Sequence, residues 1–213
     1  FLDQISRDPE FAAAHSLKAR ALGTIFFFQW SDTPQDTLVA ATEAAKRAIE
    51  LDDQNAQAHA ALGYIYRFTG EVEPAIANLE RAVALNPNDA RIRLELAHTY
   101  DWFRMQSEAL PHIELALKLS PRDPMLQNMY IYKGHILFHL GQYEDALEAA
   151  RQLGAVATSN TWRVFHQLLR AANLNKLGRS EEAQKAVDAA LLINTKLSTS
   201  AMQRQFAGSK NHP

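Results

Sequence analysis

The stretch HAALGYIYRFTGEVEPAIANLERAVALNPND occupies residues 59–89, and its pattern returns in the residues that follow. The second copy, RLELAHTYDWFRMQSEALPHIELALKLSPRD, occupies residues 93–123, so matched positions lie 34 residues apart (93 minus 59). Both copies place a small residue, Gly63 or Ala97, directly after a leucine and three positions before a tyrosine. A pattern that returns at a fixed interval without gaps indicates a structural repeat.

The repeat continues beyond these two copies. An alanine marks the same position in the second half of every copy: Ala41, Ala75, Ala109, Ala146 and Ala183. The last three intervals are 34, 37 and 37 residues, and the extra residues are expected in loops after Pro121 and around 156–161. Apolar residues recur at helical spacing in both halves of a copy, and Pro87 and Pro121 end the second half. The pattern therefore predicts a series of antiparallel helix pairs.

Small residues mark two further places in each copy. Bulky side chains would separate the two helices of a pair where they cross, so this position is expected to hold a small residue, and it holds Gly63, Ala97, Gly134 and Ala171. The turn between the two helices is expected to need a positive φ, which glycine adopts without strain. The turn glycines are Gly70, Gly141 and Gly178.

This residue pattern and its period resemble the tetratricopeptide repeat. The resemblance implies an all-α fold, a right-handed superhelical solenoid of antiparallel helix pairs whose first helices line a concave groove. It assigns residues 1–213 to a single array. The predicted parts are the tail of a truncated repeat at 1–9, an extended repeat at 12–55, repeats at 56–89, 90–123, 127–160 and 164–197, and a C-terminal capping helix at 198–207. The added residues of the extended repeat are expected to lengthen its helices or the turn between them.

Composition narrows the class of protein. The 213 residues include no cysteine, which excludes disulfides and thiolate zinc sites. A formal net charge of -2 provides no general attraction for nucleic acid. The most apolar run, residues 25–28, is far shorter than the ~20 residues that span a bilayer. Since Phe1 opens the chain without an initiator Met or a signal-peptide layout, we expect a cytoplasmic piece of a larger protein, with neither nucleic acid nor membrane as partner.

The inner faces of the predicted first helices would line the groove. Their side chains are aromatic, basic or imidazole-bearing, as in interface hot spots. The partner-binding residues predicted there are Tyr64, Arg67, Arg91, His98, Asp101, Trp102, Asn128, His135 and His139. An alternative for Phe68, Trp102 and Phe138 is that they complete the core between repeats. We therefore predict a non-catalytic module that binds a protein or peptide partner, as a monomer or weak dimer.

No residue pattern predicts catalysis. The sequence has no phosphate-binding glycine loop, no GxSxG and no HExxH motif. His135 and His139 are four residues apart, and His98 and Asp101 occupy matching positions of the preceding repeat, so together they could supply metal ligands. Such spacing also arises by chance in a chain with eight histidines. The prediction is no metal, no cofactor and no enzymatic activity for this stretch of chain.

The N-terminal copy contains the aromatic sequence FFFQW at residues 26–30. These side chains either pack on an upstream repeat or form an exposed apolar patch for dimerisation or for a neighbouring domain. The extended first repeat and the ending Leu197-Ser198-x-Ser200-Ala201-x5-Phe206 resemble the C-terminal tetratricopeptide regions of bacterial class III adenylate/guanylate cyclase-like proteins and related winged-helix regulators. That resemblance implies an alternative role in signal transduction, as the sensor region of an output domain that lies upstream.

Overall fold

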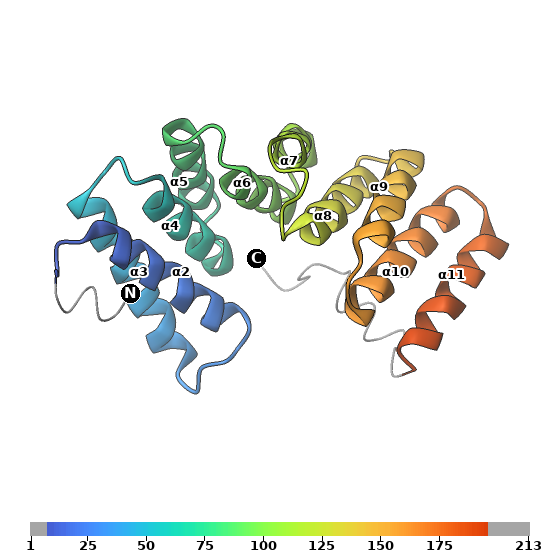
Figure 1. Cartoon of the computed structure of the whole chain (residues 1–213), viewed down its shortest axis with the longest axis horizontal. Coiled ribbons are helices and arrows are strands. Elements are labelled where there is room, and N and C mark those ends of the chain that lie inside the picture. Colours follow the sequence, from blue (N-terminus) through green and yellow to red (C-terminus); the bar gives the residue numbers. More distant parts are fainter. Residues whose placement is uncertain (1–7, 196–213) are drawn as a thin grey trace. The chain divides into compact units, whose positions relative to one another are not determined.

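The computed structural model describes residues 8–195, and every regular element among them is an α-helix. The ten helices of this described range, labelled in Figure 1, are α2 (Ala12–Phe27), α3 (Pro34–Leu51), α4 (Ala56–Thr69), α5 (Val72–Leu85), α6 (Ala90–Trp102), α7 (Gln106–Leu119), α8 (Leu126–His139), α9 (Tyr143–Val156), α10 (Asn160–Lys176) and α11 (Ser180–Ile193). The predicted all-α class is confirmed. None of these helices has both the length and the apolar character needed to cross a membrane.

The chain divides between Phe103 and Arg104 into two compact units. Unit 1 contains α2 to α6, and unit 2 contains α7 to α11. The boundary between the two units falls inside the repeat expected at 90–123.

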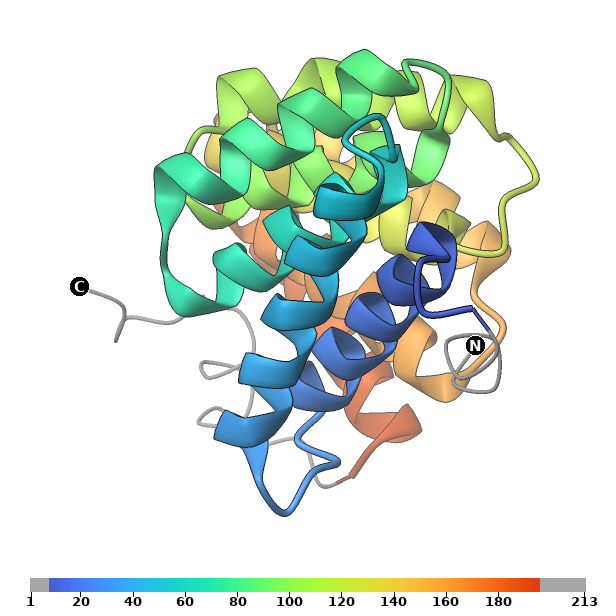
Figure 2. The ribbon, with the colours of Figure 1, turned by 90° about the vertical axis from the view of Figure 1, so that its left-hand side faces the viewer.

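In unit 1 the helices pack in pairs, α2 against α3 and α4 against α5. Figure 2 shows α2 and α3 side by side, joined by the turn at residues 28–33. The added residues of the extended repeat lengthen both helices, to 16 residues in α2 and 18 in α3, against 14 in each of α4 and α5. Alanines dominate the buried contact between α2, α3 and α4, which lets the backbones approach closely. Helix α6 then packs on α4 and α5.

In unit 2 each helix packs on the next one, from α7 through to α11. Helix α10 begins at Asn160, where the Ser159 hydroxyl caps it by accepting a hydrogen bond from the Trp162 amide. Part of the insertion expected as a loop at 156–161 thus lengthens α10 to 17 residues. The repeat boundary expected between residues 160 and 164 consequently lies inside this helix.

Gly63 and Gly134 permit two different kinds of close contact between helices. A Cβ on Gly63 would lie 2.7 Å from Leu79 Cγ and 2.8 Å from the Ala75 carbonyl oxygen, both on α5, so this glycine permits the predicted crossing within a pair. A Cβ on Gly134 would instead meet the side chain of Leu169 on α10. Gly134 was expected to face the second helix of its own pair. It faces α10 instead, because α8 also packs on the first helix of the following pair.

The turn glycines have the predicted conformation. Gly70, Gly141 and Gly178 have φ values of 78°, 76° and 74°, in the left-handed region. Arg104, which lies 34 residues after Gly70 (104 minus 70), holds the same kind of turn with φ 65°. This turn geometry is therefore kept even where the repeat lacks glycine.

Replacing Gly70 by alanine is expected to lower the free energy of unfolding by about 1–2 kcal/mol, because a Cβ is strained at positive φ. Urea unfolding followed by circular dichroism measures the change. Asparagine tolerates this region better, so Gly70→Asn serves as the control and should lose less. Equal stability of Gly70→Ala and the parent would contradict the argument.

Two predicted features fall outside this description. The truncated repeat tail at 1–9 lies mostly outside the described residues, and the capping helix at 198–207 lies wholly outside them.

Candidate binding surfaces

A row of aromatic rings crosses the ends of three first helices in unit 1. We call it the aromatic row, and it consists of Trp30, Phe28, Phe27, Phe68 and Trp102. Neighbouring ring centroids are 4.9 Å apart from Trp30 through Phe28 and Phe27 to Phe68, and Phe68 and Trp102 are 6.0 Å apart. These separations are those of interacting aromatic pairs, so the rings support one another across α2, α4 and α6.

One end of the aromatic row is exposed. Trp30 is 71% exposed, Phe28 53% and Phe27 42%, whereas Phe68 and Trp102 are half-buried. Single exposed apolar side chains are common on proteins, but three adjacent aromatic rings make a contiguous patch. A patch of this kind is characteristic of a surface that contacts a partner.

Residues 26–30 contact the following helix pair in part and are exposed in part. The rings of Phe26 and Phe27 reach Phe68 of α4, at centroid distances of 6.5 Å and 4.9 Å. They therefore pack on the following helix pair, whereas the sequence suggested an upstream pair. Phe28 and Trp30 are exposed, and contact with an upstream repeat or with a partner stays a prediction for them.

A buried charge network lies next to the aromatic row. Arg67 of α4 is 2% exposed, and its Nη1 donates to Glu95 Oε2 at 3.3 Å and to Thr99 Oγ1 at 3.1 Å, both on α6. Arg20 of α2 donates to the other oxygen of Glu95, also at 3.3 Å. One carboxylate thus joins three first helices. The Arg67 guanidinium also lies 5.0 Å from the ring centre of Phe68, which ties the network to the aromatic row.

Two residues predicted to line the groove are buried. Arg67 and Asp101 are only 2% and 5% exposed, so neither presents its side chain to a partner. Helical spacing places Arg67 on the inner face of α4, as predicted. However, α6 covers that position, and the Glu95 carboxylate there compensates the charge.

The other predicted residues of unit 1 remain accessible to different degrees. Arg91 is exposed, whereas Tyr64, His98 and Trp102 are half-buried. Burial, followed by the charge of Glu95, raises the pKa of Tyr64. Burial also lowers the pKa of Arg20, against the opposing effect of Glu95. The phenol of Tyr64 is therefore uncharged at neutral pH. Its side chain is partly packed against neighbours and partly exposed.

In unit 2 the predicted residues Asn128, His135 and His139 all lie on α8. The Nε2 atoms of His135 and His139 are 3.0 Å apart, and Arg104 Nη1 lies 3.3 Å from Nε2 of His139. His139 is exposed, and Asn128 and His135 are half-buried. Across residues 8–195 no three or more His, Cys, Asp or Glu side chains come together in a way that could hold a metal ion.

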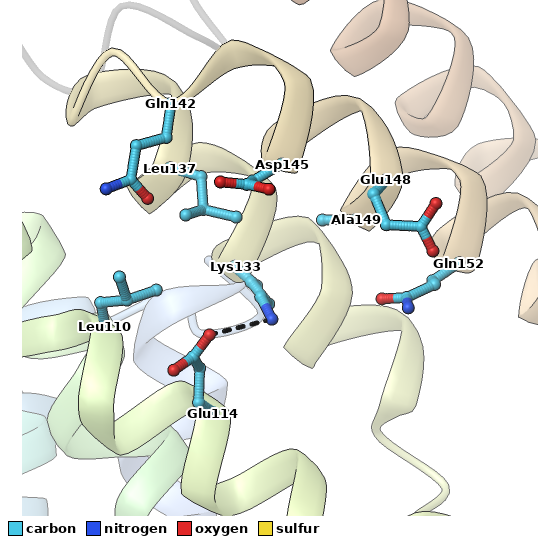
Figure 3. Close-up of a pocket in the computed structure, with 9 residues that line it drawn as sticks. All are labelled: Leu110, Glu114, Lys133, Leu137, Gln142, Asp145, Glu148, Ala149 and Gln152. Atoms are coloured by element: carbon cyan, nitrogen blue, oxygen red, sulfur yellow. Dashed lines mark ion pairs between the residues drawn. The ribbon is translucent and has the colours of Figure 1, made fainter.

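A pocket of about 250 Å³ opens between α7, α8 and α9 of unit 2 (Figure 3). Its apolar side, which we call the pocket floor, consists of Leu110, Leu137 and Ala149. The other lining residues are Glu114, Lys133, Gln142, Asp145, Glu148 and Gln152. Lys133 Nζ and Glu114 Oε1 form an ion pair of 3.1 Å across α8 and α7, drawn as a dashed line in Figure 3. This pocket was not predicted. Leu137 stands where two copies have tyrosine and two others, at Leu22 and Leu174, have leucine.

Comparisons with known proteins agree with the prediction of a tetratricopeptide repeat. The family model of the tetratricopeptide repeat matches residues 63–101. No curated protein sequence matches the chain. Among solved structures, YrrB, described as a tetratricopeptide protein with an unusual peptide-binding site, has a TM-score of 0.70 at 18% identity over 96% of this chain and 97% of that chain. A thermophilic tetratricopeptide protein of Thermus thermophilus, TTC0263, has a TM-score of 0.64 at 20% identity, over 90% and 97% of the two chains.

A third similar structure is MamA, with a TM-score of 0.66 at 20% identity over 76% of this chain and 91% of that chain. At such identities the similarity concerns the fold. None of these three proteins is described as a nucleotide cyclase or a winged-helix regulator, so they lend no support to that finer resemblance. The described chain therefore has the fold of tetratricopeptide-repeat proteins, with the sequence match to the repeat itself at residues 63–101.

Proposed function

We propose that unit 1 is a non-catalytic binding module that holds a segment of a partner protein or peptide on the aromatic row. The observation that carries the proposal is the exposed end of that row, at Phe27, Phe28 and Trp30. Helix pairs stacked in this fold present an extended surface of fixed shape, which suits binding. YrrB, which has a similar fold, is described as peptide-binding, and this supports the same class of function here.

The helices that carry the aromatic row are held rigidly, and this rigidity favours binding. Aromatic side chains bury a large apolar area on contact and have few rotatable bonds, so they dominate interface energetics. The buried network of Arg67 and Glu95 fixes α4 against α6 next to the row, so the surface needs little reordering on binding. Arg91 and His98 remain proposed flanking contacts on α6. Asn128, His135 and His139 remain proposed contacts of unit 2.

Trp30→Ala is expected to weaken binding about tenfold or more, since truncating an aromatic anchor typically costs over 1 kcal/mol. The probe is a peptide selected on the full chain from a random phage-displayed library, with affinity measured by fluorescence anisotropy. Phe28→Ala should act in the same direction. Both side chains are exposed, so the melting temperature should stay nearly unchanged.

Leu17→Ala is the matched control, because Leu17 lies on α2 and is 53% exposed, as Phe28 is. Its affinity for the selected peptide should equal that of the parent. A peptide that binds the Trp30→Ala and Phe28→Ala variants as tightly as the parent would refute the proposed surface. So would a failure to select any peptide.

A further inference from the structure

The pocket of unit 2 lies beside Leu137, at a position where the two regular copies of the repeat have a tyrosine. The position three residues after the small residue holds Tyr66 and Tyr100 in the two regular copies, but Leu137 in the copy on α8. In unit 1, Tyr100 is buried and its hydroxyl donates a 2.6 Å hydrogen bond to Glu80 Oε1 on α5. The copy on α6 therefore fills this place with a planar ring whose hydroxyl donates to a carboxylate.

The carboxylate that meets Tyr100 has a counterpart beside Leu137, although the copy on α8 has no tyrosine there. Glu114 follows Glu80 by 34 residues (114 minus 80), at the same position of the second helix. In place of a phenol, Glu114 pairs with Lys133, which itself stands where the regular copy has the buried Leu96. Lys133 and Leu137 thus stand where the two regular copies have a leucine and a tyrosine, and the copies with Lys18 and Leu22 and with Arg170 and Leu174 show the same exchange. A pocket with charged walls opens beside these two side chains of α8.

The walls of the pocket carry an excess of negative charge. Three carboxylates line the pocket: Glu114 is paired with Lys133, Glu148 is paired with Arg151 beside the pocket, and Asp145 is the third. A hydrogen bond from Arg151 keeps the pKa of Glu148 below its usual range, so this group stays ionised at neutral pH. Asp145 has no hydrogen-bond or ion-pair partner within residues 8–195. Asp145 is therefore the carboxylate of this lining that can accept hydrogen bonds from a cationic ligand without breaking an ion pair.

We propose that this pocket binds an arginine side chain of a partner polypeptide. The methylene stem of arginine would lie on the pocket floor, as long cationic side chains do on apolar surface. Its planar guanidinium would take the place of the missing phenol and donate to Glu114 and Asp145, because the guanidinium matches carboxylates with several donors at once. The inference rests on the lining of unit 2 alone and is independent of the function proposed for the aromatic row.

The test uses the full chain, labelled with ¹⁵N, and Nα-acetyl-arginine methylamide as the probe. Titration should give saturable shifts of the backbone amides of α8 and α9. The citrulline analogue has nearly the same shape but no charge, and it should bind about fivefold more weakly or worse. Asp145→Asn should weaken arginine binding by a similar factor. Glu181→Gln, which removes an exposed carboxylate of α11 outside the pocket, should leave binding unchanged.

A second variant closes the pocket by restoring the repeat. Leu137→Tyr returns the tyrosine beside Glu114, so it should abolish arginine binding while keeping the helical circular dichroism spectrum. Equal affinity for the arginine and citrulline probes would overturn the proposal, as would the absence of saturable shifts. If Leu137→Tyr does not fold, the comparison between Asp145→Asn and Glu181→Gln decides, and equal binding by these two variants also overturns it.

Discussion

Glu95→Ala is expected to lower the free energy of unfolding by about 3–5 kcal/mol, because it leaves a buried cation without its counter-charge. Arg67 is 2% exposed, so water cannot replace the lost carboxylate. The remaining hydrogen-bond partner of its Nη1 is Thr99 Oγ1, and the adjacent Tyr64 and Phe68 rings supply only cation–π attraction. Arg20, whose side chain is 25% exposed, loses far less on the same change because water screens it. Urea unfolding of the variant and the parent gives the difference.

The matched control is Glu50→Ala, which removes an exposed ion pair with Arg47 in α3. Surface pairs of this kind contribute about 0–1 kcal/mol, so this variant should resemble the parent. In the Glu95→Ala background, adding Arg67→Met removes the uncompensated charge and should restore part of the lost stability. If Glu95→Ala costs no more than Glu50→Ala, the network does not hold α4 to α6, and the rigidity argued for the aromatic row fails with it.

Local signals in the sequence were sufficient to predict the helix pairs. A turn needs a positive φ regardless of what surrounds it, so Gly70 and Gly141 could be assigned to turns from their position between two helical patterns. Gly63 could be assigned to a close helix crossing for a similar reason, because only its own pair determines that contact. These features depend on residues close together along the chain, which is why the sequence reveals them.

Contacts between successive pairs were not predictable in the same way. The spacing of Arg67 marks it as an inner-face residue, but nothing in α4 indicates that Glu95 and Thr99 of α6 cover it. The error at Gly134 has the same origin, since its close neighbour Leu169 belongs to the following pair. The pocket could not be found from Leu137 alone, because Leu22 and Leu174 hold the same position in two other copies.

Gly63→Leu is expected to cost about 3 kcal/mol, at the upper end of the usual range for overpacking a core. The first added atom would already lie 2.8 Å from the backbone oxygen of Ala75, which cannot rotate away as a side chain can. Because each helix pair contacts mainly its neighbours, hydrogen exchange should show the largest loss of protection in α4 and α5. Ala77→Leu on the exposed face of α5 is the control for added apolar volume, and its stability should match that of the parent.

Two further variants separate the two contacts at Gly63. Gly63→Ala places its Cβ against both Leu79 Cγ and the Ala75 carbonyl oxygen. Truncation by Leu79→Ala removes the first contact and leaves the second, so the double variant should be more stable than the sum of the single effects predicts, yet less stable than Leu79→Ala alone. Purely additive effects would mean that the Leu79 side chain already has room to move. A double variant as stable as Leu79→Ala alone would mean that the backbones of α4 and α5 can separate, and the close crossing would then not be what requires a glycine here.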